Sequence, residues 1–588
     1  MRMLRSRIVC LIALGSLFAP AVPPAPAHAA ETAGDAAAAG QIRINQLGFL
    51  PGSRKLAVVE SDRSREFEVV REGDGQVVLH GETGAPASWE PAARDAAIAD
   101  LGALEAPGRY RIRIEGMPPS DPFPVDAQAY AGLADAALKA FYFNRSGSAL
   151  DPAHAGAYAH TGGHPDTEVE IHASAASPGR PAGTLISAPR GWYDAGDYNK
   201  YIVNSGITTW TLLAAYEHFP AFFRGRDLGI PESGDAVPDI LDEAWWNLEW
   251  MLAMQDPGDG GVYHKLTNLR FDGEVMPEQA TERRYVVQKT TAAALDFAAV
   301  MATASRVYAG YEAQFPGVAA RMRAAAEAAW RWAQAHPDVA YRQPDDVHTG
   351  AYGDAKLDDE FAWAAAELYL LTGESGYWQA FERHAAVPTV PSWSDVGTLG
   401  WISLAQHPHR LPDATARERV AAAVGGLAAR LTGRWQASPW RVAMQPPDFV
   451  WGSNAMALNQ AMVLLQGYRL APRREYLDAA QSQLDYVLGR NPLGVSFVTG
   501  HGLRTPQHIH HRPSQADGIA APVPGWLSGG PNPRQQDAGD CPGVAYPSSL
   551  PALSWLDHGC SYASNEIAIN WNAPLVYVAA ALQQLTPL

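Results

Sequence analysis

The stretch VPDILDEAWWNLEWMLAMQ, residues 237–255, decides the fold class of most of the chain. Its apolar residues recur at the spacing of an amphipathic helix, and its acidic residues lie toward the start, where they suit the helix dipole. Comparable helical stretches follow further along the chain. No strand-like alternation lies between them, and they show no fixed repeat period. Residues 128–588 are therefore predicted to form a helical toroid or solenoid whose loops carry the function. The comparable stretches are 285–308, 317–335, 359–372, 415–432, 453–470, 474–489 and 573–585.

Residues 41–127 show a different pattern, that of short strands. The segments KLAVVES, EFEVVRE and QVVLHGE are rich in Val and are bounded by Gly, Asp and Ser. In GRYRIRIEG the apolar Tyr110, Ile112 and Ile114 alternate with three Arg, which predicts a half-buried antiparallel strand. The region is predicted to be a small immunoglobulin-like β-sandwich.

The N-terminus has the pattern of a secretory signal peptide. Three Arg precede an apolar run at 8–21, and APAHA fits a small-residue cleavage site. Residues 1–29 are predicted to be the signal peptide and 30–40 a small-residue linker. No later apolar run has membrane-spanning length. The mature protein is therefore expected outside the cytoplasm, either extracellular or periplasmic.

Composition narrows the range of partners. The formal net charge of −17 disfavours nucleic acid and anionic membranes, whereas a neutral polymer would be indifferent to it. The 18 Trp could stack on sugar rings or fill the core. Cys541 and Cys560 remain after removal of the signal peptide. They could form a disulfide or remain as two free thiols. The oligomeric state stays unknown.

The first candidate site is RGWYDAGDYNKY, residues 190–201, in which Asp194 and Asp197 are three residues apart. One carboxylate could activate a water while its neighbour orients it. A polar turn, a helix N-cap or a calcium loop are the alternatives. Aromatic rings nearby could stack on a sugar. The rings are Trp192, Tyr193, Tyr198 and Tyr201.

The second candidate is Glu566, in SYASNEIAINWNAP. Apolar residues flank it and Trp571 is close, so its pKa is expected to be raised, as a general acid requires. The alternative is a Glu in the first turn of the last helix.

The third candidate is HIHHRPS, residues 508–514, with three His and Arg512. These side chains could bind a metal or sugar hydroxyls. No nearby Cys or acid completes a zinc set, which favours hydroxyl binding.

These segments resemble glycoside hydrolase family nine. SFVTGHGLRTPQHIHHR (496–512) is similar to the first family signature, with His510 and Arg512 at its fixed positions. WLDHGCSYASNEIAINWNA (555–573) resembles the second, with Asp557 and Glu566 in place. DAGDYNKY resembles the motif that holds the nucleophilic water, and the resemblance extends over residues 130–588. IRINQLGF resembles the start of the immunoglobulin-like module in one subgroup of the family.

The resemblance implies an (α/α)6 barrel that hydrolyses β-1,4-glucans with inversion. Asp197 would be the base for the attacking water, Asp194 would help hold that water, and Glu566 would protonate the leaving oxygen. His510 and Arg512 would bind sugar hydroxyls, with Asp557 in a supporting role. No cofactor is required for this chemistry.

Endo-acting cleavage of cellulose or related β-glucans is the leading hypothesis. An exo-acting cellodextrinase, glucosidase or exo-glucosaminidase is the alternative on the same scaffold. A non-catalytic glycan-binding protein is disfavoured because all three carboxyls are present. Either of two loop-rich segments, 151–188 and 520–554, could wall off one end of the cleft and decide the mode of action.

The resemblance also raises two metal questions. Subgroup members often carry a zinc bound by Cys and His, but Ser146 and Gly163 occupy the Cys positions here, which argues against zinc even though His164 and His172 remain. AYGDAKLDDEF offers oxygen ligands for a structural calcium, with PESGDAVPD as a weaker second site. Acids at helix starts are the alternative. The proposed calcium ligands are Asp354, Asp358, Asp359 and Glu360.

Overall fold

The computed structural model describes residues 41–587. The predicted signal peptide, linker and Leu588 lie outside the described residues.

The N-terminal part is a β-sandwich, as predicted. One sheet has the strand order β1 (Ile42–Arg43), β2 (Leu56–Glu60), β6 (Arg94–Asp100) and β5 (Ala87–Trp89). The other has the order β4 (Val77–Glu82), β3 (Glu66–Arg71), β7 (Gly108–Arg113) and β8 (Phe123–Val125).

The alternation in β7 sets which face packs inward. Tyr110 and Ile112 are fully buried in the sandwich core, where Ile112 lies opposite Val69 of β3. The intervening arginines face outward, where two of them bind the carboxylate of Glu72. The predicted half-buried strand is therefore confirmed.

The C-terminal part is helical, as predicted. Within residues 41–587 twelve helices have ten residues or more, and they follow one another as six pairs of an outer and an inner helix. The outer helices are α1 (Ala131–Phe143), α5 (Asp239–Ala253), α7 (Val318–Ala335), α9 (Ser375–His384), α11 (Ala414–Ala437) and α13 (Arg474–Val487). The inner helices are α3 (Ile202–His218), α6 (Thr291–Tyr308), α8 (Asp358–Thr372), α10 (Gly397–Gln406), α12 (Ser453–Leu470) and α16 (Ile569–Leu585).

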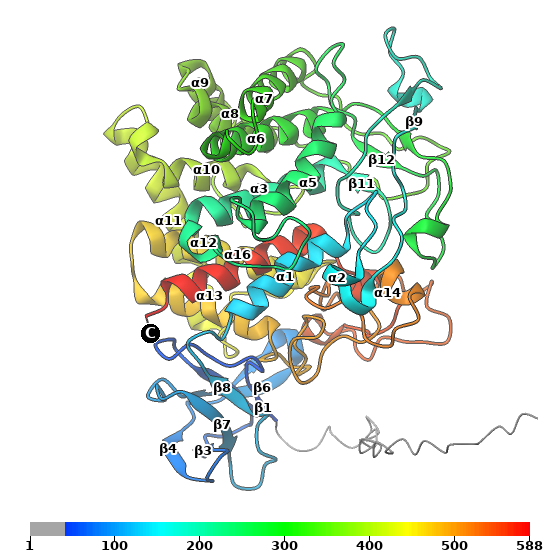
Figure 1. Cartoon of the computed structure of the whole chain (residues 1–588). Coiled ribbons are helices and arrows are strands. Elements are labelled where there is room, and N and C mark those ends of the chain that lie inside the picture. The colour runs from blue at the N-terminus through cyan, green and yellow to red at the C-terminus, as the bar shows by residue number, and fades with distance from the viewer. Residues whose placement is uncertain (1–40, 588) are drawn as a thin grey trace, which may run out of the picture. The chain divides into compact units, whose positions relative to one another are not determined.

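The helices form a closed ring because the last inner helix returns to the first. Helix α16 packs against both α12 and α3, and α3 continues through α6 and α8 to α10 (Figure 1). The inner helices are buried on nearly every side, whereas α7, α9 and α11 bury one face. This arrangement is the predicted (α/α)6 barrel.

The sandwich packs directly on the barrel. Trp89 of β5 lies 5.2 Å from the ring of Trp440, within the barrel's own hydrophobic core. Asn45 donates a hydrogen bond of 2.9 Å to the buried carboxylate of Asp485 on α13. The two parts therefore share apolar and polar contacts.

Two smaller features position loops. A five-stranded sheet of short strands, in the order β10 (Leu185–Ile186), β9 (Val169–Ile171), β13 (Tyr285–Val286), β12 (Lys265–Thr267) and β11 (Lys200–Tyr201), lies beside the barrel. Cys541 and Cys560 form a disulfide, which settles the open question about their pairing.

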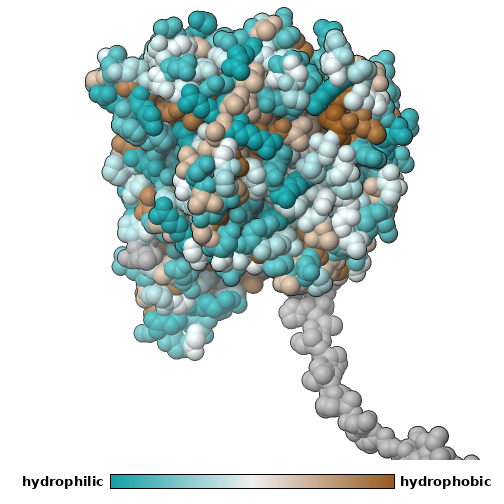
Figure 2. All heavy atoms as spheres, turned by 45° about the horizontal axis from the view of Figure 1, so that its top comes forward, coloured by the Kyte–Doolittle hydropathy of each residue, from teal (hydrophilic) through white to brown (hydrophobic). Residues whose placement is uncertain are grey.

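The surface matches the charge of the chain. The face in Figure 2 is mostly hydrophilic, and hydrophobic residues gather there in separate hollows. No helix in residues 41–587 is both long and apolar enough to cross a membrane.

Candidate active site

A cleft of about 910 Å³ brings together the side chains that the sequence motifs singled out. Asp194, Asp197 and Glu566 all line it, although Glu566 follows Asp197 by more than half the chain. His510 and Arg512 join them. Its other lining residues come mainly from loops that precede inner helices, and they include Tyr201, Phe271, Tyr352, Trp393, Trp451, Asp540, Tyr562 and Trp571.

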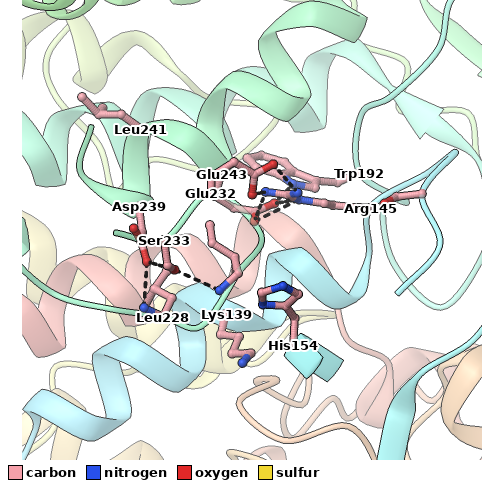
Figure 3. Close-up of polar contacts among 12 residues, drawn as sticks. Lys139, Arg145, His154, Trp192, Leu228, Glu232, Ser233, Asp239, Leu241 and Glu243 are labelled. Carbon is pink, nitrogen blue, oxygen red and sulfur yellow. Dashed lines mark hydrogen bonds and ion pairs between the residues drawn. The ribbon is translucent and has the colours of Figure 1, made fainter. Parts of the chain in front are cut away.

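The loop that carries Asp194 and Asp197 is anchored by a buried network of hydrogen bonds and ion pairs. Trp192 donates from its indole nitrogen to Glu243 over 2.7 Å, and Glu243 also binds the guanidinium of Arg145 (Figure 3). Arg145 is held in addition by Glu232 at 3.0 Å. This buried network ties the loop to α5.

The structure corrects part of the predicted sugar-stacking set. Trp192, Tyr193 and Tyr198 are at most 2% exposed and do not line the cleft. Tyr193 and His164 share a hydrogen bond of 2.8 Å, and Tyr198 donates to the Val275 carbonyl. These rings fill the base of the loop, because a loop that presents two carboxyls on one side needs a packed underside.

Two members of that set do lie at the cleft. Tyr201 and Trp571 both line it. The Tyr201 hydroxyl donates to the carboxylate of Asp197 over 3.1 Å, so this ring also positions a candidate catalytic group.

Asp194 and Asp197 have different partners. Asp197 accepts from the amide of Asn199 at 2.5 Å. Asp194 accepts from Asn204 at 2.5 Å and from the Tyr352 hydroxyl at 2.7 Å. Burial, followed by the neighbouring Asp197, raises the pKa of Asp194 to about 8. Both carboxyl groups are therefore fixed in place, each by donors that the other does not use.

Glu566 approaches this loop through Gly196. Its carboxyl accepts from the Gly196 amide over 3.2 Å. A side chain at Gly196 would put its Cβ 2.5 Å from the His510 carbonyl, so only glycine permits this approach. Removal from solvent, followed by Asp197, raises the pKa of Glu566 well above its ordinary value. This shift favours the protonated form of Glu566, the form that a general acid requires.

Glu566 is not part of the last helix. It follows the short helix α15 (Tyr562–Asn565) and precedes the first residue of α16 by three positions. The alternative reading, a Glu in the first turn of that helix, is therefore wrong.

His510 presents an acceptor to the cleft. Its Nδ1 lies 2.6 Å from the Gly559 carbonyl, which only accepts, so Nδ1 carries the hydrogen. Burial lowers the pKa of His510, which keeps the ring neutral. Nε2 then carries no hydrogen and is available as a hydrogen-bond acceptor.

Arg512 and Asp557 hold neighbouring backbone. Arg512 donates to the carbonyls of Gly196 and Asp272 over 2.7 and 2.9 Å. Asp557 accepts from the His508 amide and from the side chain of Asn565, both at 2.9 Å. Since Asn565 directly precedes the acid, this geometry matches the supporting role predicted for Asp557.

Of the proposed calcium ligands, Asp354, Asp359 and Glu360 lie near Asp296 of α6, whereas Asp358 pairs elsewhere. No group of three or more His, Cys, Asp or Glu side chains in residues 41–587 is arranged to hold a metal ion. Asp358 binds His384 at 2.7 Å and is largely exposed, and Asp359 accepts from the Val396 amide. Glu360 is buried instead, beside Asp296 of α6, because its position on α8 faces the ring interior.

The residues at the zinc positions bind one another directly. Ser146 donates to the His164 carbonyl over 3.3 Å, and the Tyr193 hydroxyl lies 3.4 Å from the Gly163 carbonyl. His172 binds Asp346 and Ser174, away from this group. Ser146 and His164 are therefore in contact, whereas the hydrogen-bond partners of His172 are Asp346 and Ser174.

Several cleft residues had not been singled out from the sequence. Tyr352 lies in the segment read as a calcium loop, and Trp451 and Tyr562 lie in motif segments without being chosen. Outside the cleft lining, Lys265 lies 5.6 Å from the Tyr201 ring and donates to the Gly350 carbonyl, and burial lowers its pKa to about 7. Asp540 has no signal in the sequence, because its place depends on the disulfide.

Comparison with known proteins agrees with this site. The family "Glycosyl hydrolase family 9" matches residues 130–579, and "Cellulase N-terminal ig-like domain" matches 37–118. The "Xyloglucan-specific endo-beta-1,4-glucanase BoGH9A" of Bacteroides ovatus is 43% identical, over 92% of this chain and 94% of that protein. The "Cellodextrinase" of Butyrivibrio fibrisolvens is 31% identical, over 92% and 99%.

The fold comparison leads to the same family. The solved structure "Bacteroides ovatus GH9" superposes with a TM-score of 0.86 and 41% identity, over 93% of this chain and 99% of that one. The chain therefore belongs to glycosyl hydrolase family 9, and it is a glycoside hydrolase.

Proposed function

We propose that the protein is a secreted, endo-acting β-1,4-glucanase that inverts the anomeric carbon. The observation that carries this proposal is the meeting of Asp194, Asp197 and Glu566, whose pKa is raised by burial, in one open cleft. Secretion is supported by the signal pattern of residues 1–29.

The proposed reaction uses one base and one acid. Asp197 takes a proton from a water whose oxygen attacks the anomeric carbon, while Asp194 helps to orient that water. The bond from that carbon to the glycosidic oxygen breaks, and Glu566 gives its proton to the leaving oxygen. Asp197 ends protonated and Glu566 ionised, and exchange with solvent restores both.

Inversion requires space for a water between base and substrate, with the two carboxyls about 6.5–9.5 Å apart. No hydrogen bond joins Asp197 and Glu566 in the part of the chain that the structure describes. Membership of glycosyl hydrolase family 9 supports a water nucleophile over direct attack by a carboxylate.

The substrate is proposed to be a neutral, soluble β-1,4-glucan. The similarity to an enzyme named as specific for xyloglucan favours a substituted glucan over crystalline cellulose. A cleft with aromatic residues along it, among them Phe271, Trp393 and Trp451, suits several consecutive sugar rings.

Two measurements test this function. Proton NMR of the first products from cellohexaose should show the α-anomer, and an initial β-anomer would overturn inversion. Hydrolysis of xyloglucan and of mixed-linkage glucan should lower the viscosity of the solution rapidly and release products of mixed length. One dominant small product from the start would instead establish the exo-acting alternative.

A further inference from the structure

One wall of the cleft is made by a carboxylate and a tyrosine. Asp540 and Tyr562 both line the cleft, and the Tyr562 hydroxyl donates to Asp540 Oδ2 over 2.7 Å. The Tyr562 ring also lies 5.2 Å from Trp451 and 5.9 Å from His510. This pair therefore adjoins both an exposed aromatic platform and the candidate catalytic groups.

The disulfide adjoins both members of the pair. Asp540 directly precedes Cys541, and Tyr562 follows Cys560 by two residues. The two Cα atoms of the bridge are 5.4 Å apart, while the loop between the cysteines spans 19 positions of sequence. The bridge thus fixes the separation of two backbone segments, each of which carries one member of the pair.

Buried groups hold the same loop from its inner side. The carboxylate of Asp537, which is fully buried, accepts from the Ala563 amide at 2.7 Å and from the Tyr546 hydroxyl at 2.7 Å. Tyr546 also contacts Ser561 at 2.9 Å. The loop is therefore a packed part of the wall, and Asp540 is presented from a fixed backbone.

The charge of Asp540 has no counter-ion. No described Lys, Arg or His forms an ion pair with it, and no described donor binds Oδ1. Arg512, which also lines the cleft, donates hydrogen bonds to the carbonyls of Gly196 and Asp272. An exposed carboxylate that forms no ion pair in the described residues, fixed in a substrate cleft, can act on the charge and the hydroxyls of a chain that enters that cleft.

We propose that Asp540 is a specificity-determining residue that selects uncharged sugar chains. Its free Oδ1 accepts a hydroxyl of a neutral glucan, and its charge repels chains that carry carboxylate or sulfate groups. The disulfide is the positioning device that keeps Oδ1 directed at the substrate. This inference rests on the glucanase function proposed above and names the class of glucan within it.

Asp540→Asn tests the charge with little change of shape. The two substrates are carboxymethylcellulose and hydroxyethylcellulose, which share a backbone and differ in the charge of the substituent. The ratio of kcat/KM on the anionic polymer to that on the neutral one should rise about three- to fivefold. The rise should shrink at high salt, which screens exposed charges. Asp74→Asn, an exposed acid on the sandwich, is the matched control.

The outcomes separate the two proposals. Turnover of both polymers with an unchanged ratio in Asp540→Asn, or an equal change in Asp74→Asn, overturns the charge selection alone. No turnover of either polymer by the wild type overturns the glucanase function and the charge selection with it.

The positioning role of the bridge has its own variant. The double change Cys541→Ser and Cys560→Ser should raise KM on hydroxyethylcellulose and move the polymer ratio in the same direction as Asp540→Asn. Circular dichroism controls for the fold. A folded double variant with the wild-type ratio and KM would show that the bridge does not position Asp540.

Discussion

At the scale of single residues, the partners of each carboxyl decide what it can do. Asp197 and Asp194 lie three positions apart, yet Asn199 and Tyr201 hold one while Asn204 and Tyr352 hold the other. The glycine between them lets a third carboxyl approach from the far end of the chain. Spacing alone therefore does not assign the roles, and the donors around each group do.

Glu566→Gln should abolish most polymer hydrolysis while leaving the fold intact. The amide has nearly the same shape but carries no acidic proton, so kcat should fall about 10²- to 10⁴-fold. The loss should be much smaller on dinitrophenyl cellobioside, whose leaving group departs without protonation. Steady-state kinetics on both substrates checks this, and near-wild-type polymer turnover would contradict the acid assignment.

The pH profile should report the same group. Because the pKa of Glu566 is raised well above its ordinary value, the acid keeps its proton to a higher pH than an ordinary Glu does. Activity should therefore fall only as the pH rises through that raised pKa. The basic limb of kcat/KM measures it, and a basic limb near the ordinary pKa of a Glu, about 4.3, would be inconsistent with the assignment.

The roles of several aromatic residues could not be read from the sequence. The motif places Trp192, Tyr193 and Tyr198 beside the two Asp, but it does not say which side of the loop faces the cleft. Their partners come from other segments: Glu243 for Trp192, His164 for Tyr193 and the Val275 carbonyl for Tyr198. The pattern indicated a site correctly and left the orientation of each ring undetermined.

At the scale of elements, periodicity predicted four outer helices and four inner ones, the latter being α6, α8, α12 and α16. The outer helices α5, α7, α11 and α13 follow the predicted stretches closely. Helix α3 was not singled out, because IVNSGITTWTLLAAYEH is buried on nearly every side and has no polar stripe to mark a period. Helices α9 and α10, with ten residues each, are too short for a clear pattern.

Buried acids between inner helices make stability depend on pH. Asp296 on α6 is fully buried, and neither carboxyl oxygen has a hydrogen-bond partner in the described residues. Burial, with Asp359 and Asp354 nearby, raises its pKa well above the ordinary value. The folded protein therefore binds a proton that the unfolded chain releases above about pH 4. Stability should fall as the pH rises toward the raised pKa.

Asp296→Asn should remove this dependence. When the pH is raised from 5 to 8, the unfolding free energy of the variant should increase by at least ~1 kcal/mol relative to that of the wild type. The reason is that the amide has no proton to lose. Thermal unfolding at both pH values measures the difference, with the exposed Asp358→Asn as the control. Equal pH dependence in variant and wild type would refute the explanation. A calcium-induced rise in melting temperature that Asp296→Asn removes would identify a cation site there instead.

At the scale of the whole molecule, the sandwich contacts segments that lead into the cleft. Trp89 lies 6.2 Å from the ring of Phe449, which precedes the cleft residue Trp451 by two positions. The turn after β5, Glu90–Ala92, packs against Pro551–Leu553 inside the disulfide-bridged loop. The sequence predicted a sandwich and a barrel, but these contacts join segments that no local pattern relates.

Trp89→Ala should therefore affect both stability and substrate binding. Truncating this buried ring leaves a cavity and should cost about 3–5 kcal/mol of unfolding free energy. Since Trp89 touches no cleft residue directly, kcat should stay near the wild-type value, while KM should rise as the segment before Trp451 loosens. Calorimetry and kinetics on xyloglucan measure the two effects, with Val77→Ala on the opposite sheet as the control. An unchanged KM in a destabilised variant would show that the sandwich stabilises the barrel without shaping the cleft.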